Sequence, residues 1–587
     1  MTTFVKALDN RTPMQYGENG HSEYGWSRNL EERIYQFYTQ TTRTSIERVK
    51  ELGIILHDIL TEIHDQYDTD KMSKENKIDM LSILYKMIGL TRDITDGKGE
   101  YTLSYMMIYT WYSFYPMLAM FALKTFVLLE EEETNIPVHP YGSWKDMKYF
   151  ANYCLQNGAD RTHPLICFCA DLVNNQLKKD IYNYVNCNYG EISLVAKWIP
   201  SEKSNKFGWF FKQLAVQYFP NYMASASSEL QQKYAAKKCY TEYRKLCSPL
   251  NKWLDTVQIK QCANEWSTID PAKQTSITMH KQKNAFLNKT KEGDVRIDKP
   301  DRIECSEHFK EYIDKGLRGE ITIKGKRIGM NDFTRDALQL IHSQNNQKER
   351  DILNLQWTDS SKTNDNDTLG NMIAMVDVSG SMSGDPLHAA IALGIRIAEK
   401  SALGKRVLTF SAYPNWVNLD EAHTFVDMVE LIENSTWGTN TNIYAAFKMI
   451  CDAIETSKLP KEQAMDMILV ILSDMQIDTA DTKSLSSSLY NEIEFMYAEL
   501  GKRLYNTPIR PPHILFWNLR CTNGFPVLSS QPNVSSVSGF NPSFLNLFCE
   551  KGVNALTECR PWSIMLEALG KDRYTVLDLE LKEFFTD

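Results

Sequence analysis

The feature that most constrains the fold is a series of short, uninterrupted apolar runs in the C-terminal part of the chain. The runs cover residues 372–376, 406–410, 467–472 and 514–517, the second being the weakest. Strands that are buried on both faces of a parallel sheet have this continuous apolar character. The helical stretches between the runs cover residues 386–402, 442–455 and 484–504. Strands that alternate with helices predict a doubly wound α/β domain.

The part of the chain before these runs has the spacing of helices. From about residue 29 to residue 341, apolar residues recur three and four positions apart, with Gly, Pro and Asn clusters between the runs. This pattern predicts an α-helical repeat domain, either an open solenoid or a ring-like stack. The predicted segments are an irregular N-terminal segment over 1–28, a helical-repeat domain over 29–357, a linker over 358–370, an α/β domain over 371–555 and a tail over 556–587. We expect the tail to form a helix and a short strand that pack back on the body.

Composition narrows the class of protein. The chain has 587 residues, more than one hydrophobic core usually organises, and a net charge of −9, which argues against a wholly basic nucleic-acid-binding protein. The N-terminus lacks the basic and then apolar layout of a signal peptide, and the 12 cysteines include no Cys-x-x-Cys pair. We therefore expect an intracellular, cytoplasmic protein with reduced thiols that is not secreted.

One uncharged stretch is long enough to cross a bilayer. It covers residues 105–123, but it contains Thr110, Ser113 and Pro116, and the proline would break a helix at that point. Two short helices buried in the helical domain explain the stretch better than a membrane span does.

A group of oxygen-bearing side chains follows three of the predicted elements. Asp377-Val-Ser-Gly-Ser comes directly after the first strand, with Asp385 and Pro386 expected as the cap and first residue of the next helix. Trp437-Gly-Thr-Asn-Thr precedes another helix, and Leu472-Ser-Asp ends the most apolar strand. Ligands of doubly wound sheets collect at the carboxyl edge, where all three pieces are expected. An all-oxygen set suits Mg²⁺, with Mn²⁺ or Ca²⁺ as alternatives, and the absence of His and Cys disfavours zinc and copper.

The three pieces together resemble the metal-ion-dependent adhesion site of von Willebrand factor A domains. The residues that carry the resemblance are Asp377-Val-Ser-Gly-Ser-Met, Gly438-Thr439 and Ser473-Asp474. The resemblance implies a cation ligand set of Asp377, Ser379, Ser381, Thr439 and Asp474, on an exposed loop. It also implies that an acidic residue of a protein partner completes the coordination. The alternative is that Asp377 and Ser379 only cap turns, as Asp and Ser often do.

The helical half carries a second resemblance. Ser193-Leu-Val-Ala-Lys-Trp-Ile-Pro, Tyr243-Arg-Lys-Leu-Cys-Ser-Pro and Met279-His-Lys-Gln-Lys-Asn-Ala-Phe resemble a domain family of unknown function found in plants, fungi and giant viruses. That family is similar in layout to the TROVE or Ro ribonucleoprotein autoantigen family, in which an A domain closes a ring of helical repeats that binds RNA. If the source is a giant virus, the resemblance implies a location in the host cytoplasm or the virion.

Local charge gives independent support for RNA as a partner. Residues 191–300 contain about 18 Lys and Arg against about 10 Asp and Glu, and aromatic residues lie among them. Cations interleaved with aromatic rings suit single-stranded RNA, whose bases can stack on the rings, while the resemblance to the Ro family adds structured RNA as a possible partner. The RNA-binding candidates are Lys197, Lys203, Lys206, Trp209, Lys212, Arg244, Lys245, Lys281 and Lys283. A solvated basic face with the aromatic residues in the core would produce the same pattern.

These observations favour a binding protein over an enzyme. No Gly-Lys-Ser/Thr phosphate loop and no Gly-x-Ser-x-Gly elbow occurs in the sequence. The leading interpretation is a cation-dependent binding scaffold in an RNA–protein assembly. Two alternatives stay open: a protein-only adaptor that binds an acidic partner residue, and a metal-dependent hydrolase. The oligomeric state is not constrained by the sequence.

Overall fold

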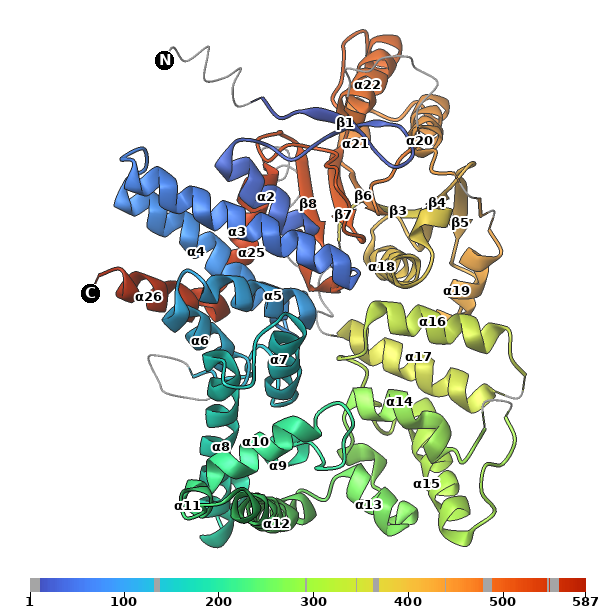
Figure 1. Cartoon of the computed structure of the whole chain (residues 1–587). Coiled ribbons are helices and arrows are strands. Elements are labelled where there is room, and N and C mark those ends of the chain that lie inside the picture. Colours follow the sequence, from blue (N-terminus) through green and yellow to red (C-terminus); the bar gives the residue numbers. More distant parts are fainter. Residues whose placement is uncertain are drawn as a thin grey trace.

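Figure 1 shows a chain made of a long helical part and a sheet domain with helices on its faces. This computed structural model describes residues 11–130, 138–290, 293–344, 346–362, 369–435, 437–438, 440–478, 488–545, 548 and 559–586. A mostly helical N-terminal part followed by a mostly parallel sheet confirms the fold class that the sequence predicts.

The sheet has six strands in the order β5-β4-β3-β6-β7-β8, and all neighbours are parallel except the β4–β5 pair. Its strands are β3 Met372–Asp377, β4 Arg406–Phe410, β5 Asn415–Asn418, β6 Ile468–Ser473, β7 His513–Asn518 and β8 Val534–Ser538. The four apolar runs form β3, β4, β6 and β7. No apolar run marks β5, which is a half-exposed edge strand, or β8, whose buried residues include three serines.

The two faces of the sheet belong to different hydrophobic cores. The helices of this domain are α18 Asp385–Lys400, α19 Phe425–Glu433, α20 Ile443–Ser457, α21 Lys461–Met465 and α22 Leu489–Tyr505. Leu469 and Ile471 of β6 pack in a core with α20 and α22. Val470 and Leu472 point to the other face, where α18 and residues of the helical part form one continuous core. Side chains alternate between the faces along a strand, so β6 must be apolar at every position.

The helical part forms two limbs. The first limb contains α2 Leu30–Gln40, α3 Ile46–Asp68, α4 Lys74–Arg92, α5 Tyr101–Tyr112, α6 Pro116–Thr125, α7 Lys145–Gln156, α8 Pro164–Val185, α9 Val195–Trp198, α10 Gly208–Tyr218, α11 Pro220–Ala224 and α12 Glu229–Trp253. The second limb contains α13 Val257–Ala263, α14 Ser276–Phe286, α15 Pro300–Leu317, α16 Met330–Ile341 and α17 Gln347–Ser361. The expected linker therefore begins later than residue 358, because α17 continues to Ser361; residues 363–368 lie outside the described part.

Each limb contacts the α/β domain at one of its ends. The first limb begins with α2, which contacts β8, and the second limb returns through α16, which packs along α18. A hydrogen bond from Arg327 Nη1 to the carbonyl oxygen of Ile94, at 2.8 Å, joins the limbs near this domain. The arrangement is therefore ring-like rather than an open solenoid, with the α/β domain closing the ring (Figure 1).

The uncharged stretch over residues 105–123 lies in two helices of the first limb. The chain turns between α5 and α6, and Pro116 is the first residue of α6, where a proline is tolerated. Among the described residues, none of the helices is both long and apolar enough to cross a bilayer.

Two terminal segments differ from the expectation. Residues of the supposedly irregular N-terminal segment form a hairpin of β1 Met14–Tyr16 and β2 Ser22–Tyr24, which owes its order to contacts with the α/β domain more than 450 residues later. The tail forms two helices, α25 Pro561–Leu569 and α26 Thr575–Phe584, and no strand within residues 559–586. The helical spacing of apolar residues through α26 leaves no alternating pattern that a strand would need.

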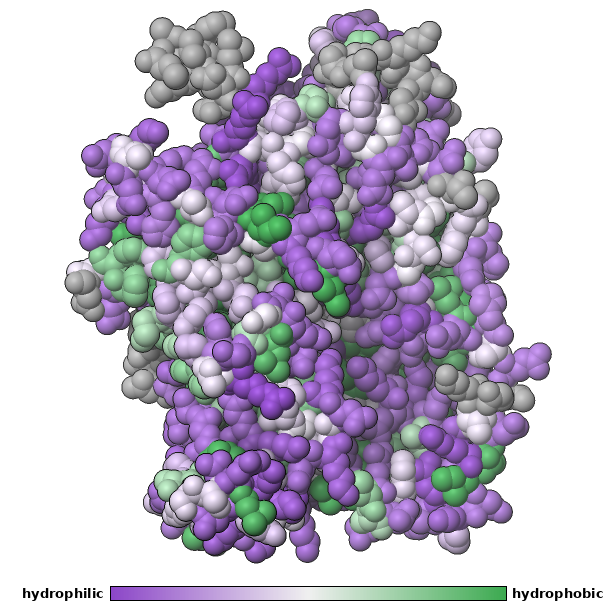
Figure 2. All heavy atoms as spheres, viewed as in Figure 1, coloured by the Kyte–Doolittle hydropathy of each residue, from purple (hydrophilic) through white to green (hydrophobic). Residues whose placement is uncertain are grey.

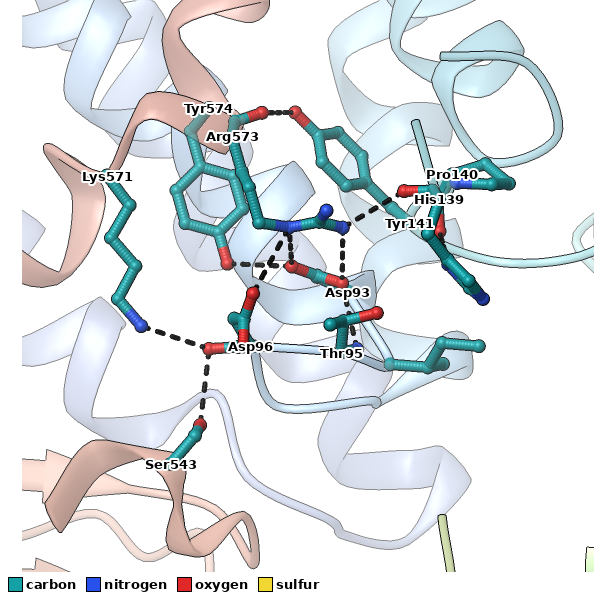
Figure 3. A network of polar contacts seen from close by, with 12 residues as sticks. Asp93, Thr95, Asp96, His139, Pro140, Tyr141, Ser543, Lys571, Arg573 and Tyr574 are labelled. Carbon is teal, nitrogen blue, oxygen red and sulfur yellow. Dashed lines mark hydrogen bonds and ion pairs between the residues drawn. The ribbon is translucent and has the colours of Figure 1, made fainter. Parts of the chain in front are cut away.

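Figure 3 shows the polar network that fastens the C-terminal segment to the first limb. The guanidinium of Arg573 donates to both carboxylate oxygens of Asp93, from Nε at 2.9 Å and from Nη2 at 3.0 Å. Tyr574 donates to the same carboxylate at 3.1 Å. Asp93 is fully buried, so these bonds replace the water that its charge would otherwise need.

The double-sided burial of β6 gives a stability prediction. Leu472→Asp should lower the free energy of unfolding by several kcal/mol, because it places an unpaired charge in a fully buried position. Leu403→Asp, at an exposed position of the same domain, should leave it nearly unchanged. Thermal unfolding followed by circular dichroism measures both, and equal melting temperatures would contradict the packing of β6.

Candidate metal-binding site and lysine–aromatic cluster

Asp377 is the centre of the candidate metal site. It is the last residue of β3, lies opposite Phe410 of β4 and is fully buried. Its carboxylate accepts hydrogen bonds from the backbone N–H of Ser379 at 3.0 Å and from the hydroxyl of Ser473 at 2.6 Å. The sequence interpretation placed Asp377 at the end of the strand, as observed, and expected the loop after it to be exposed, whereas both Asp377 and Ser379 are buried.

The loop after Asp377 holds two hydroxyls beside it. The hydroxyl oxygens of Ser379 and Ser381 are 3.2 Å apart, and the buried side chain of Met382 anchors the loop in the core. Gly384 then has a φ of +93°, a conformation that favours glycine, and α18 begins at the next residue.

Asp385 does not cap α18, contrary to the sequence interpretation. Gly384 occupies the cap position, and Asp385 is the first helical residue. Its carboxylate accepts a hydrogen bond from Arg43 Nη1 at 3.1 Å, so it joins the α/β domain to the first limb instead of capping the helix.

Asp474 enters the site from the end of β6. It is fully buried, its Oδ1 accepts from the N–H of Gln476 at 3.1 Å, and the nearby Ser381 side chain lowers the pKa of its carboxyl group. Within the described part of the chain, Asp474 Oδ2 accepts no hydrogen bond, and its ion-pair contact is Arg520 Nε at 3.3 Å. The following residue, Met475, has a φ of +62°, an uncommon conformation for a side chain of this type that often marks functional sites.

Burial raises the pKa of both carboxyl groups of the site. Burial and, to a lesser degree, the charge of Asp474 raise the pKa of Asp377 to about 7, against the hydrogen bonds from Ser473 and Ser379. Burial also raises the pKa of Asp474, while Arg520 opposes that change. The site thus holds two buried carboxyl groups and one guanidinium, and a divalent cation would stabilise both carboxylates.

Thr439 lies outside the described residues, but its neighbours locate the loop. A methyl group on Gly438 would lie 3.1 Å from the hydroxyl of Ser411, at the end of β4. Thr441 donates its N–H to Asp478 Oδ2 at 2.7 Å, which ties the loop to the segment after Asp474. The hydroxyls of Ser411 and Thr441 are buried and form no hydrogen bond within the described residues. Sequence reasoning missed them because serine and threonine in loops are too common to signal a site.

The residues present fit a hard cation. Asp377, Ser379, Ser381 and Asp474 come together at one edge of the sheet and supply only oxygen atoms. Among the described residues, no group of three or more His, Cys, Asp or Glu side chains could hold a metal. A cation here would therefore depend on hydroxyl oxygens as well as on the two carboxylates.

The RNA-binding candidates differ in exposure and in pairing. Lys203, Lys206, Lys212 and Lys281 are exposed, and Lys197 and Trp209 are half-buried. Arg244 and Lys245 are exposed but bonded to Glu202 and Glu242. Lys283 is buried and paired with Asp336, so it cannot serve as an RNA contact, contrary to the interpretation of the sequence. Helix α14 turns this lysine toward α16 rather than toward solvent.

Three lysines of the first limb lie over aromatic rings, and a fourth, Lys145, lies close to one of them. This lysine–aromatic cluster consists of Lys145, Lys148, Lys197 and Lys206 with Tyr149, Trp198 and Phe207. Lys148 Nζ lies 5.2 Å from the ring centre of Trp198, and Lys206 Nζ lies 5.5 Å from that of Tyr149. Burial and, to a lesser degree, the charge of Lys145 lower the pKa of Lys148 to about 8.

The cluster faces the second limb. Lys281 of α14 is close enough to contribute to the lowered pKa of Lys145 on α7, and Figure 1 shows α7 and α9 on the side of the first limb nearest α14. Sequence reasoning missed Lys145 and Lys148 because they precede the basic stretch that begins at residue 191. Their spacing of three residues on one helical face was the available signal.

The face of the molecule in Figure 2 is mostly hydrophilic, and its hydrophobic residues lie in separate small groups. Single exposed apolar residues are normal on protein surfaces. This face therefore favours polar or charged partners over a large apolar one.

Two family models match parts of the chain. Residues 371–571 match a domain of unknown function, DUF7788, and residues 155–363 match a second one, DUF2828. The first match includes the sheet and α25, and the second runs from the end of α7 to the end of α17.

One relative and one solved structure are similar over most of the chain. An uncharacterized protein of Acanthamoeba polyphaga mimivirus is 27% identical over 580 residues, which cover 95% of this chain and 87% of that protein. The crystal structure of the Deinococcus radiodurans Ro protein aligns with a TM-score of 0.33 and 9% identity, covering 89% of this chain and 99% of that one.

The hydroxyl of Ser473 gives a prediction for the site itself. It donates to Asp377 and accepts from the N–H of Met475 at 3.0 Å. Ser473→Ala should therefore lower the free energy of unfolding by about 1–3 kcal/mol, while Ser473→Thr, which keeps the hydroxyl, should restore most of it. Urea denaturation measures the difference; an alanine variant as stable as the wild type would show that this hydrogen bond is not needed.

Proposed function

We propose that this chain is a non-enzymatic binding scaffold with a divalent-cation site of the von Willebrand A type. The observation that supports the proposal best is the convergence of Asp377, Ser379, Ser381 and Asp474 at the carboxyl edge of the sheet. Doubly wound sheets bind ligands at this edge. The cation is proposed to be Mg²⁺, with Mn²⁺ or Ca²⁺ as alternatives, and Thr439 is proposed as a further ligand.

The role proposed for this site is to bind a protein partner through the cation. When bound, a hard cation supplies an open coordination position that attracts a carboxylate oxygen. Residues of the chain fix the geometry of the site. Ser473 orients Asp377, and Gln476 orients Asp474. The buried side chain of Met382 anchors the loop that follows Asp377. The proposed protein partner therefore presents an exposed Asp or Glu side chain.

We also propose RNA as a second partner, bound at the lysine–aromatic cluster. The cluster combines ammonium groups, which attract phosphates, with aromatic rings, on which unpaired bases stack. Together the two sites would make the chain a scaffold that joins a protein partner to RNA. Without the RNA site, the chain would be a protein-only adaptor.

Titration calorimetry tests the metal site. Mg²⁺ should bind the wild type, and Asp377→Asn should remove binding, because it takes away one of two carboxylates while keeping the size of the side chain. Asp420→Asn, on the surface of the same domain, is the control and should bind like the wild type. Equal affinity of Asp377→Asn and wild type would exclude this site.

Filter binding at about 0.1 M salt, near physiological screening, tests the RNA site. Replacing Lys148 and Lys206 by Gln should weaken binding to single-stranded RNA and lower the slope of log K against log salt by about 0.7 for each phosphate that is no longer neutralised. Trp198→Ala should cost about 1–3 kcal/mol of binding energy if a base stacks there.

The control for this experiment replaces Lys448 and Lys458 by Gln. These exposed lysines lie in and directly after α20 of the α/β domain, away from the cluster, and should not change the affinity. Melting curves show whether each variant is folded. If folded wild type binds neither single-stranded RNA nor a duplex with a single-stranded tail, the adaptor function replaces the RNA-binding one.

A further inference from the structure

Arg520 stands beside the candidate metal site and competes for one of its carboxylates. It follows the end of β7, and its Nε lies 3.3 Å from Asp474 Oδ2. Asp474 is fully buried, and this oxygen accepts no hydrogen bond within the described part of the chain. The guanidinium therefore neutralises a carboxylate that a cation would also need.

The other end of the same guanidinium contacts the N-terminal hairpin. Arg520 Nη2 donates to the carboxylate of Glu18, which lies in the turn between β1 and β2. Gln476 holds this turn in place: its side-chain oxygen accepts from the N–H of Glu18 at 2.6 Å, and its carbonyl accepts from Asn19 Nδ2 at 3.0 Å. Since Gln476 also donates its N–H to Asp474, the hairpin turn and the metal-site loop share one residue.

The hairpin is docked firmly enough to fix the position of Glu18. Tyr24 and Phe525 exchange two backbone hydrogen bonds, at 3.0 Å and 2.9 Å. The carboxylate of Glu23 fills the space above Gly524, where a methyl group would lie 1.7 Å from its carboxyl carbon. Glu18 is thus an exposed acid held at a defined place beside Arg520, not a freely moving surface side chain.

We propose that Arg520 and Glu18 set the cation affinity of the metal site in opposite directions. Arg520 lowers the affinity, because its positive charge pairs with Asp474 and repels a cation. Glu18 raises the affinity, because it offers the guanidinium a second carboxylate when a cation takes Asp474. The inference rests on the proposed metal site and adds to it an internal counter-ion, linked to the N-terminal hairpin.

This arrangement predicts opposite shifts for two substitutions in one ion-pair chain. Arg520→Gln should tighten Mg²⁺ binding by about tenfold or more, since it removes a unit charge in direct contact with a ligand. Glu18→Gln should weaken binding by about threefold, a smaller change because the exposed carboxylate is screened by solvent. The double variant should resemble Arg520→Gln, because Glu18 acts mainly through Arg520.

Calorimetric titration of the full chain with MgCl₂ measures these affinities, and melting curves in chelator and in Mg²⁺ give a second readout. Arg520→Gln should melt lower than the wild type in chelator but gain more on addition of Mg²⁺, because the cation replaces the missing charge. A purely structural role would lower both melting temperatures equally. Arg503→Gln and Glu455→Gln, an exposed pair of the same domain, are matched controls and should change neither quantity.

The outcomes separate this inference from the proposed function. If the wild type binds Mg²⁺ through Asp377 but Arg520→Gln binds equally or more weakly, the metal site stands and the role of Arg520 is wrong. Unchanged or tighter binding by Glu18→Gln would likewise remove the role of Glu18. If neither the wild type nor Arg520→Gln binds Mg²⁺, the metal site and this inference fall together.

Discussion

One face of the central sheet shares its hydrophobic core with the helical limbs, and the rest of the structure depends on this shared core. One face packs against α20 and α22 in a core of its own, whereas the other shares its core with α18 and the helical limbs. The α/β domain is therefore not an independent domain joined to the limbs only by linkers. Without the limbs, the apolar side chains on the shared face would be partly uncovered, which favours a single cooperative structure over two separable domains.

This shared core also determines how the candidate metal site is held. The loop after Asp377 is anchored by Met382 in the core, and the helix that follows it is tied to the first limb through the Asp385–Arg43 pair. Arg43 in turn bonds Glu100, which is itself almost buried. The position of the loop thus depends on the helical part as well as on the sheet.

The sequence predicts the elements with strong periodic patterns and misses those that depend on distant partners. The apolar runs led directly to β3, β4, β6 and β7, since burial on both faces leaves no other composition. The hairpin of β1 and β2 carries no comparable pattern, because residues near positions 476 and 525 hold it in place. For the site, the Asp377 motif was readable, while Arg520 was not: a single arginine after a strand gains meaning only when its two carboxylates are located.

The same hairpin has a consequence for the order in which the chain acquires its structure. Its backbone partners, Asp478 and Phe525, leave the ribosome more than 450 residues after it does. A two-stranded hairpin is marginally stable by itself in water. During synthesis the hairpin therefore cannot form its contacts with the α/β domain until the segment after β7 has been made, which follows the synthesis of both limbs. The hairpin is thus made before the two limbs but is secured only after them.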